Sequence, residues 1–324
     1  MWPRGWWCWC CRSCRGVGAL YVVVGVVAAL DGVFRSAFGS YFRRMVPTAG
    51  RTRANAVRGV LQYGALVAGS ALAGVLLIQG RPDTVLEVNA ALLVVSGLLL
   101  WVPRLNPAAA DASGARGRWR QDLGWVWQFF RERPIVGAVM GLFNLGMVFG
   151  VAADAQEVVL AHRALLMTAS TYAALVSLAG VGYVLGAAAA WLIAPRVPAR
   201  WLVQVGSVAS GAGYLVYALS QGFSQAAGLV GLGLFQALAN TGFAAFTQGA
   251  LPPVQMGRIA STVRSAVAAL SIAAVLAGGL VGARWGIRPL MVSATVLMVA
   301  QGAALAIVCR SRPGVAAFEA AASA

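Results

Sequence analysis

Uncharged apolar stretches of about 20 residues recur along almost the whole chain, and this recurrence limits the folds that are open to it. A helix of that length crosses the roughly 30 Å hydrocarbon core of a bilayer and satisfies its own backbone hydrogen bonds there. Of the 324 residues, 60% are hydrophobic and only 10% are charged. Because so few polar groups cannot cover a water-facing surface, the pattern predicts an all-α polytopic transmembrane helix bundle.

Apolar runs bounded by Arg, Pro and Gly predict about nine membrane-spanning helices. The expected ranges are 18–42, 54–79, 84–103, 134–153, 168–194, 201–219, 224–249, 259–282 and 287–309. A long polar stretch divides them into three and six. We therefore expect a basic leader rich in Trp and Cys (1–16), a partial N-terminal bundle (17–104), a cytoplasmic linker (105–133), a C-terminal six-helix bundle (134–312) and a tail (313–324).

The end of the linker is amphipathic. The segment DLGWVWQFFRERP places four aromatic residues beside Arg131 and Arg133. Such a segment is typical of a helix that lies at the headgroup level of a membrane. A target helix for a calmodulin-like protein is the alternative interpretation, and the interfacial helix is the preferred one.

Arginine positions predict the orientation of the chain. All 25 basic residues are Arg, and the loops on one predicted side hold seventeen of them, against four on the other side. The first group is Arg43, Arg44, Arg51, Arg53, Arg58, Arg104, Arg116, Arg118, Arg120, Arg131, Arg133, Arg196, Arg200, Arg258, Arg264, Arg310 and Arg312, and the second is Arg81, Arg163, Arg284 and Arg288. By the positive-inside rule, we expect a multi-pass protein of the cell inner (plasma) membrane with a cytoplasmic C-terminus.

The charge and cysteine patterns exclude several other classes. A net charge of +16 on a soluble protein would suggest nucleic acid, but these arginines lie between apolar segments, where they face anionic lipid headgroups. The chain has no Lys, so it lacks the Walker A lysine and we expect no ATP binding. Four of the five cysteines fall within Cys8–Cys14, without the two separated pairs of a tetrahedral site. We therefore expect no metal and no cofactor. The composition of the first sixteen residues is also that of a misassigned start or a shifted reading frame.

Three short segments carry a family resemblance. In VFRSAFGSYFRRMVPTAGRTRANAV, a Val-Pro precedes an Arg-Ala-Asn-Ala that opens a helix, with Pro47 and Asn55 in place. The segments DLGWVWQFFRERPIV and LPPVQMGRIASTVR follow in order, the second with Gly257 and Arg258. Over roughly residues 20–310, the chain resembles the major facilitator superfamily, in particular the bacterial branch of macrolide-efflux and enterobactin-export proteins.

The resemblance implies twelve helices in two halves of six, and the matched register accounts for the fourth to the twelfth. We therefore expect a partial N-terminal half, without the first three helices, and a complete C-terminal half. The segment GSALAG, from Gly69 to Gly74, resembles the antiporter motif of the fifth helix, although Ser70 stands where the efflux pattern has proline. The segment APRVPARW keeps Arg196 and Arg200 of a related cytoplasmic loop.

Asp31 lies near the middle of the first predicted helix, and Arg35 lies one turn further on the same face. A charge at mid-membrane costs about 3 kcal/mol on insertion scales, so the pair should face a cavity or protein. Asp31 is either a proton acceptor or cation site that Arg35 tunes, or half of a structural ion pair. The resemblance favours the functional interpretation, since the fourth, seventh and tenth helices line the substrate path of this family.

Uncharged polar residues fall on the segments that the resemblance assigns to the seventh and tenth helices. They are Asn144 on the former, and Gln236, Asn240 and Thr241 on the latter. Gln236 and Asn240 are one turn apart and share a helix face. Their amides are candidates for hydrogen bonds to a substrate. The alternative is that they bridge neighbouring helices.

Asp154, Glu157 and His162, the sole histidine, fall between two predicted helices. We interpret them as solvated loop charges, with a zinc or proton-relay site as the alternative.

Together these features predict a transporter rather than an enzyme, with a small molecule and the lipid bilayer as its partners. We expect efflux of a drug-like or siderophore-like compound by proton-coupled alternating access. The competing interpretation is a truncated, non-transporting remnant or a membrane scaffold, because three plus six helices lack one wall of the cavity. A membrane enzyme is a third interpretation, for which one histidine and few membrane carboxylates leave little chemistry.

Overall fold

A computed structural model of the chain describes residues 82–101, 119–193, 196–252 and 256–323, together with single helical positions between 61 and 76. Every regular element within these ranges is a helix. In chain order they are α4 (Pro82–Trp101), α5 (Trp119–Glu132), α6 (Pro134–Val159), the π-helical turn η3 (Leu160–Ala164), α7 (Ala169–Ile193), α8 (Ala199–Leu219), α9 (Phe223–Ala250), α10 (Met256–Trp285), α11 (Ile287–Arg310) and α12 (Arg312–Ser323).

Six of these helices, α6 to α11, are long and apolar enough to cross a membrane. Each overlaps one of the predicted ranges, so the prediction of a multi-pass membrane protein built from α-helices is confirmed. Helix α4 overlaps the predicted range 84–103, but its apolar part is the shorter segment Glu87–Leu98. The predicted helix 18–42 lies outside the described residues, and 54–79 lies only partly inside them.

The chain divides into two compact units. Helix α4 belongs to the first, which comprises residues 1–59 and 75–107. Helices α5 to α12 belong to the second, which comprises residues 60–74 and 108–324. All six spanning helices therefore lie in the second unit.

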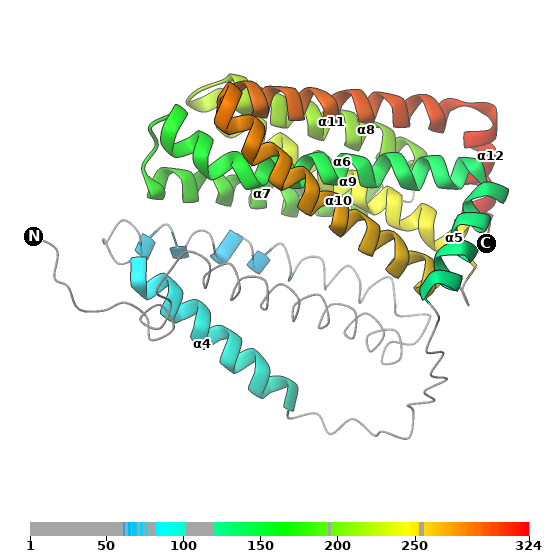
Figure 1. Cartoon of the computed structure of the whole chain (residues 1–324), viewed down its shortest axis with the longest axis horizontal. Coiled ribbons are helices and arrows are strands. Elements are labelled where there is room, and N and C mark those ends of the chain that lie inside the picture. The colour runs from blue at the N-terminus through cyan, green and yellow to red at the C-terminus, as the bar shows by residue number, and fades with distance from the viewer. Residues whose placement is uncertain are drawn as a thin grey trace, which may run out of the picture. The chain divides into compact units, whose positions relative to one another are not determined.

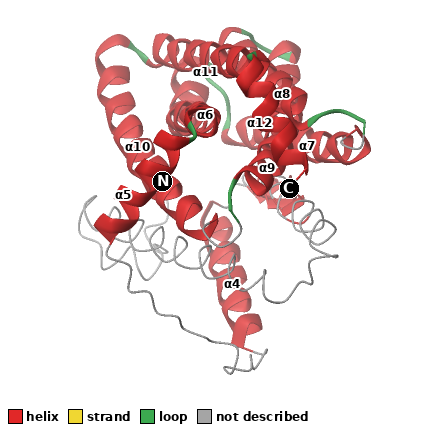
Figure 2. Ribbon diagram, turned by 90° about the vertical axis from the view of Figure 1, so that its right-hand side faces the viewer, coloured by secondary structure: helices red, strands yellow, loops and turns green. Residues whose placement is uncertain are grey.

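Within the second unit the spanning helices lie side by side along a common direction (Figure 1). Helix α9 packs against α7 and α8, and α11 packs against α6 and α8, as the end-on view in Figure 2 shows. Glycines let α7 and α9 approach closely, since the backbone of Gly182 meets Val230 and that of Gly233 meets Ala179. Helix α10 packs mainly against α6 and is the least buried of the six.

Two shorter helices lie at one end of this bundle (Figure 1). Helix α5 is the amphipathic segment of the predicted linker: Phe129 is buried in the core, whereas Trp127 is 73% exposed. Helix α12 occupies the segment that was predicted only as a tail. Its Phe318 is buried and its ring lies 4.3 Å from that of Phe246 on α9.

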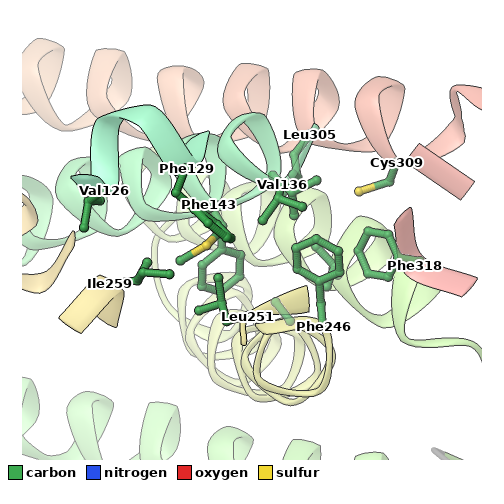
Figure 3. Packing of buried hydrophobic residues seen from close by; sticks show 14 residues of the cluster. Val126, Phe129, Val136, Phe143, Phe246, Leu251, Ile259, Leu305, Cys309 and Phe318 are labelled. Atoms are coloured by element: carbon green, nitrogen blue, oxygen red, sulfur yellow. The ribbon is translucent and has the colours of Figure 1, made fainter. Parts of the chain in front are cut away.

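The largest group of buried apolar residues lies between these two short helices and the spanning helices (Figure 3). Phe143 of α6 stacks on Phe243 of α9, with ring centroids 3.9 Å apart and nearly parallel planes. Leu305 and Cys309 close the group from α11, and Cys309 is fully buried. This apolar core therefore packs α5 and α12, which flank the six spanning helices in the sequence, against those helices.

Candidate functional site

Two of the predicted path residues form one polar pair on α9. The Gln236 Nε2 atom donates a hydrogen bond to Asn240 Oδ1 at 3.3 Å, as their spacing of one turn predicts. The same amide nitrogen lies 3.5 Å from the sulfur of Met147 on α6. The Gln236 and Asn240 amides therefore lie on the side of α9 that faces α6.

The other two predicted path residues make hydrogen bonds to their own helices. Asn144 Nδ2 donates to the carbonyl of Met140 at 2.7 Å, and the Thr241 hydroxyl donates to the carbonyl of Ala237 at 2.9 Å. Asn144 is only partly buried. Neither residue is held by a hydrogen bond to a neighbouring helix in the described part of the chain.

Asn144 also lines a cavity of about 690 Å³ between α5, α6 and α10. Its walls are almost entirely apolar, and Arg131 of α5 lies among its lining residues. The apolar lining residues include Met140, Val148 and Leu270. A cavity of this size is large enough for a drug-sized molecule.

The other predicted site residues, which belong to the family-like motifs, lie apart from the amide pair. Arg196 is exposed and lies in the α7–α8 connection, where its Nη1 donates to the carbonyl of Leu192 at 3.4 Å. Arg200 is half-buried in the first turn of α8. Gly257 and Arg258 lie in the first turn of α10, and Gly69 is a helical position with open space around its Cα. Asp31, Arg35, Pro47, Asn55 and Gly74 lie outside the described residues.

The interpretation of Asp154 and Glu157 as loop residues is wrong, and Glu157 is not a solvated charge, whereas Asp154 is an exposed residue. Helix α6 continues to Val159, six residues beyond its predicted end, so both carboxylates lie on its last turns. Glu157 is only 9% exposed. With Tyr172 of α7 and with Tyr214 and Tyr217 of α8, the two residues form what we term the carboxylate–tyrosine cluster.

The cluster has one firm hydrogen bond and one unsatisfied hydroxyl. Tyr214 Oη donates to Asp154 Oδ1 at 2.7 Å. Tyr217 is fully buried and its hydroxyl lies beside Glu157, but the geometry between the two groups does not make a hydrogen bond. Asp154 is exposed as a residue, although protein atoms crowd its carboxyl group.

His162 lies near Tyr172 of this cluster, and its ring nitrogen faces a backbone carbonyl. Its Nδ1 atom lies 3.0 Å from the carbonyl oxygen of Met167, and its ring lies 6.4 Å from that of Tyr172. Among the described residues, no group of three or more His, Cys, Asp or Glu side chains is arranged to hold a metal ion.

The spacing of the polar residues in the sequence indicates the cluster, whereas the hydropathy pattern does not. Asp154 and Glu157 are three residues apart, and so are Tyr214 and Tyr217, so each pair shares one face of a helix.

Comparison of the chain with protein-family models, with curated proteins and with solved structures finds no match. The family resemblance therefore rests on the segments quoted above.

Proposed function

We propose that the protein transports a small molecule across the membrane by alternating access, as a transporter of the major facilitator type. The observation that supports this best is the amide pair Gln236 and Asn240, which lies between spanning helices and reaches toward α6. Both amides are partly buried, and polar side chains within a membrane bundle are often found where they contact a polar group or a substrate path. In this proposal they hold the polar part of a substrate.

The weak bond of Gln236 favours a ligand over a structural role. An amide that joins helices is expected to bond a strong acceptor on the neighbouring helix. Gln236 instead meets the thioether of Met147, which is a weak acceptor. A ligand with a strong acceptor therefore competes well for this amide.

The apolar cavity beside Asn144 suits the rest of an amphipathic substrate. Met140, Val148 and Leu270 supply apolar walls, and Arg131 supplies a charge among the lining residues. The proposal is efflux of a drug-like or siderophore-like compound, driven by the proton gradient, without ATP and without enzymatic chemistry. The arginine distribution supports the plasma membrane and a cytoplasmic C-terminus.

The amide pair can be tested by a double substitution. We expect Gln236→Leu with Asn240→Leu to reduce efflux of an amphipathic dye such as ethidium at least tenfold, because leucine keeps the volume and removes the polar atoms. Dye accumulation in cells that express equal amounts of membrane-inserted protein measures this effect. Gln248→Leu is the matched control, since Gln248 is an exposed amide on the same helix. Unchanged efflux by the double variant would remove the amide pair from the path.

A further inference from the structure

The carboxylate–tyrosine cluster lies at the end of the bundle away from α5 and α12 (Figure 1). It places two carboxyl groups within one turn of α6, where like charges in a poorly solvated environment repel. Glu157 is buried, and in the described part of the chain neither carboxylate forms an ion pair. Two full negative charges without a cation are unfavourable in such a place.

No described side chain of the neighbouring helices supplies that cation. The titratable and charged residues that these elements carry at this end are Tyr172 on α7, Tyr214 and Tyr217 on α8, His162 and Arg163 in η3, Arg284 on α10 and Arg288 on α11. The side chain of Arg163 lies outside the described residues. Arg288 is exposed and donates to the carbonyl of Leu219 at 3.1 Å, and Arg284 is exposed. His162 is exposed and bonded to Met167. At this end α9 carries the buried residue Gln225, which is uncharged.

The unsatisfied hydroxyl of Tyr217 is a second and independent observation. A hydroxyl can donate to an ionised carboxylate or accept from a protonated one. Beside Glu157 it can therefore serve either charge state, by rotation of its O–H bond. A buried hydroxyl without a partner is unfavourable, so a hydrogen bond between Tyr217 and Glu157 stabilises this site.

We propose that Glu157 and Asp154 bind one exchangeable proton between them, with Tyr217 as the hydrogen-bond partner of Glu157. A proton from water reaches the exposed residue Asp154 and passes to Glu157, where an O–H bond forms and one negative charge is lost. Loss of the proton restores the carboxylate, to which Tyr217 then donates. Because lower pH adds this proton, the site is filled on the acidic side and empties as the pH rises. This inference rests on the proposed transport function and deepens it by giving it a proton site on the described helices.

Infrared difference spectroscopy on the purified full-length protein in detergent tests the proposal without any transport measurement. We expect a C=O stretching band of a protonated carboxyl at neutral pH, which disappears as the pH is raised. Glu157→Gln should abolish that band. Glu319→Gln, at an exposed glutamate of α12, should leave it unchanged. Tyr217→Phe, which keeps the packing, should shift its frequency.

Three outcomes would overturn the proposal. One is the absence of the band in the wild-type protein, which needs no variant to fold. Another is its persistence in Glu157→Gln. The third is a change of the band on adding sodium chloride but not choline chloride at constant pH, which would assign the site to an alkali cation. A failure of dye efflux would reject the proposed transport function and leave the infrared result intact.

Discussion

Gly233→Ala is expected to destabilise the six-helix bundle strongly. A Cβ atom at position 233 of α9 would contact the carbonyl oxygen of Ala179, and would lie 2.8 Å from the backbone nitrogen of Tyr183 and 3.1 Å from the carbonyl carbon of Gly182. All three are backbone atoms of α7, so the helices must separate to relieve the overlap. Overpacking of this kind costs about 3 kcal/mol. In a bundle of this size we expect the midpoint of thermal unfolding in detergent to fall by about 10 °C.

Gly231 provides the matched control, two residues away on the same helix. No atom lies within 4 Å of a Cβ built there. Alanine favours helix over glycine by about 1 kcal/mol, so Gly231→Ala should keep or slightly raise the unfolding midpoint. Equal midpoints for the two variants would contradict the close contact between α7 and α9.

The spanning helices were predictable because a single physical requirement shapes them. Helix α9 was predicted at 224–249 and lies at Phe223–Ala250, and α11 was predicted at 287–309 and lies at Ile287–Arg310. The hydrocarbon core sets both the length and the apolarity of such segments. Within the described residues the class of fold therefore follows from hydropathy alone.

The carboxylate–tyrosine cluster could not be predicted in the same way. Hydropathy ends the helix at the first carboxylate, whereas backbone hydrogen bonding carries α6 through Asp154 and Glu157 to Val159. The partner of Asp154 is the Tyr214 hydroxyl, which is 60 residues further along the chain. A local pattern does not contain that contact.

The amide pair of Gln236 and Asn240 was predictable in part. The spacing of Gln236 and Asn240 predicted their shared face correctly, because helix geometry is local. The spacing did not predict Met147 as the partner on α6, since the rotation of one helix against another depends on packing. Sequence reasoning therefore identified the candidate residues and missed what they face.

Helix α12 was missed for a related reason. Its segment RPGVAAFEAAAS is too short and too polar at its start to read as a membrane span. Alanine has the highest helix propensity, however, and five of these twelve residues are alanine. Phe318 then fixes the helix to the bundle by packing on Phe246.

Phe246→Ala is expected to destabilise the protein and to release α12. Phe246 is 1% exposed and lies in the core cluster of Figure 3 beside Phe318. Removing a buried phenylalanine ring costs about 3–5 kcal/mol, most of it from the cavity and the lost contacts. We expect a lower midpoint of thermal unfolding, and faster removal of the C-terminal segment by a protease added to the purified protein.

Phe223→Ala separates this effect from a general loss of aromatic surface. Phe223 lies on the same helix and is 88% exposed, so its ring makes few contacts within the bundle. That variant should keep the wild-type unfolding midpoint and the wild-type rate of C-terminal proteolysis. If Phe246→Ala lowers the midpoint without faster proteolysis, Phe246 stabilises the spanning helices but does not hold α12. If neither property changes, the packing of α9 against α12 is not as the structure shows it.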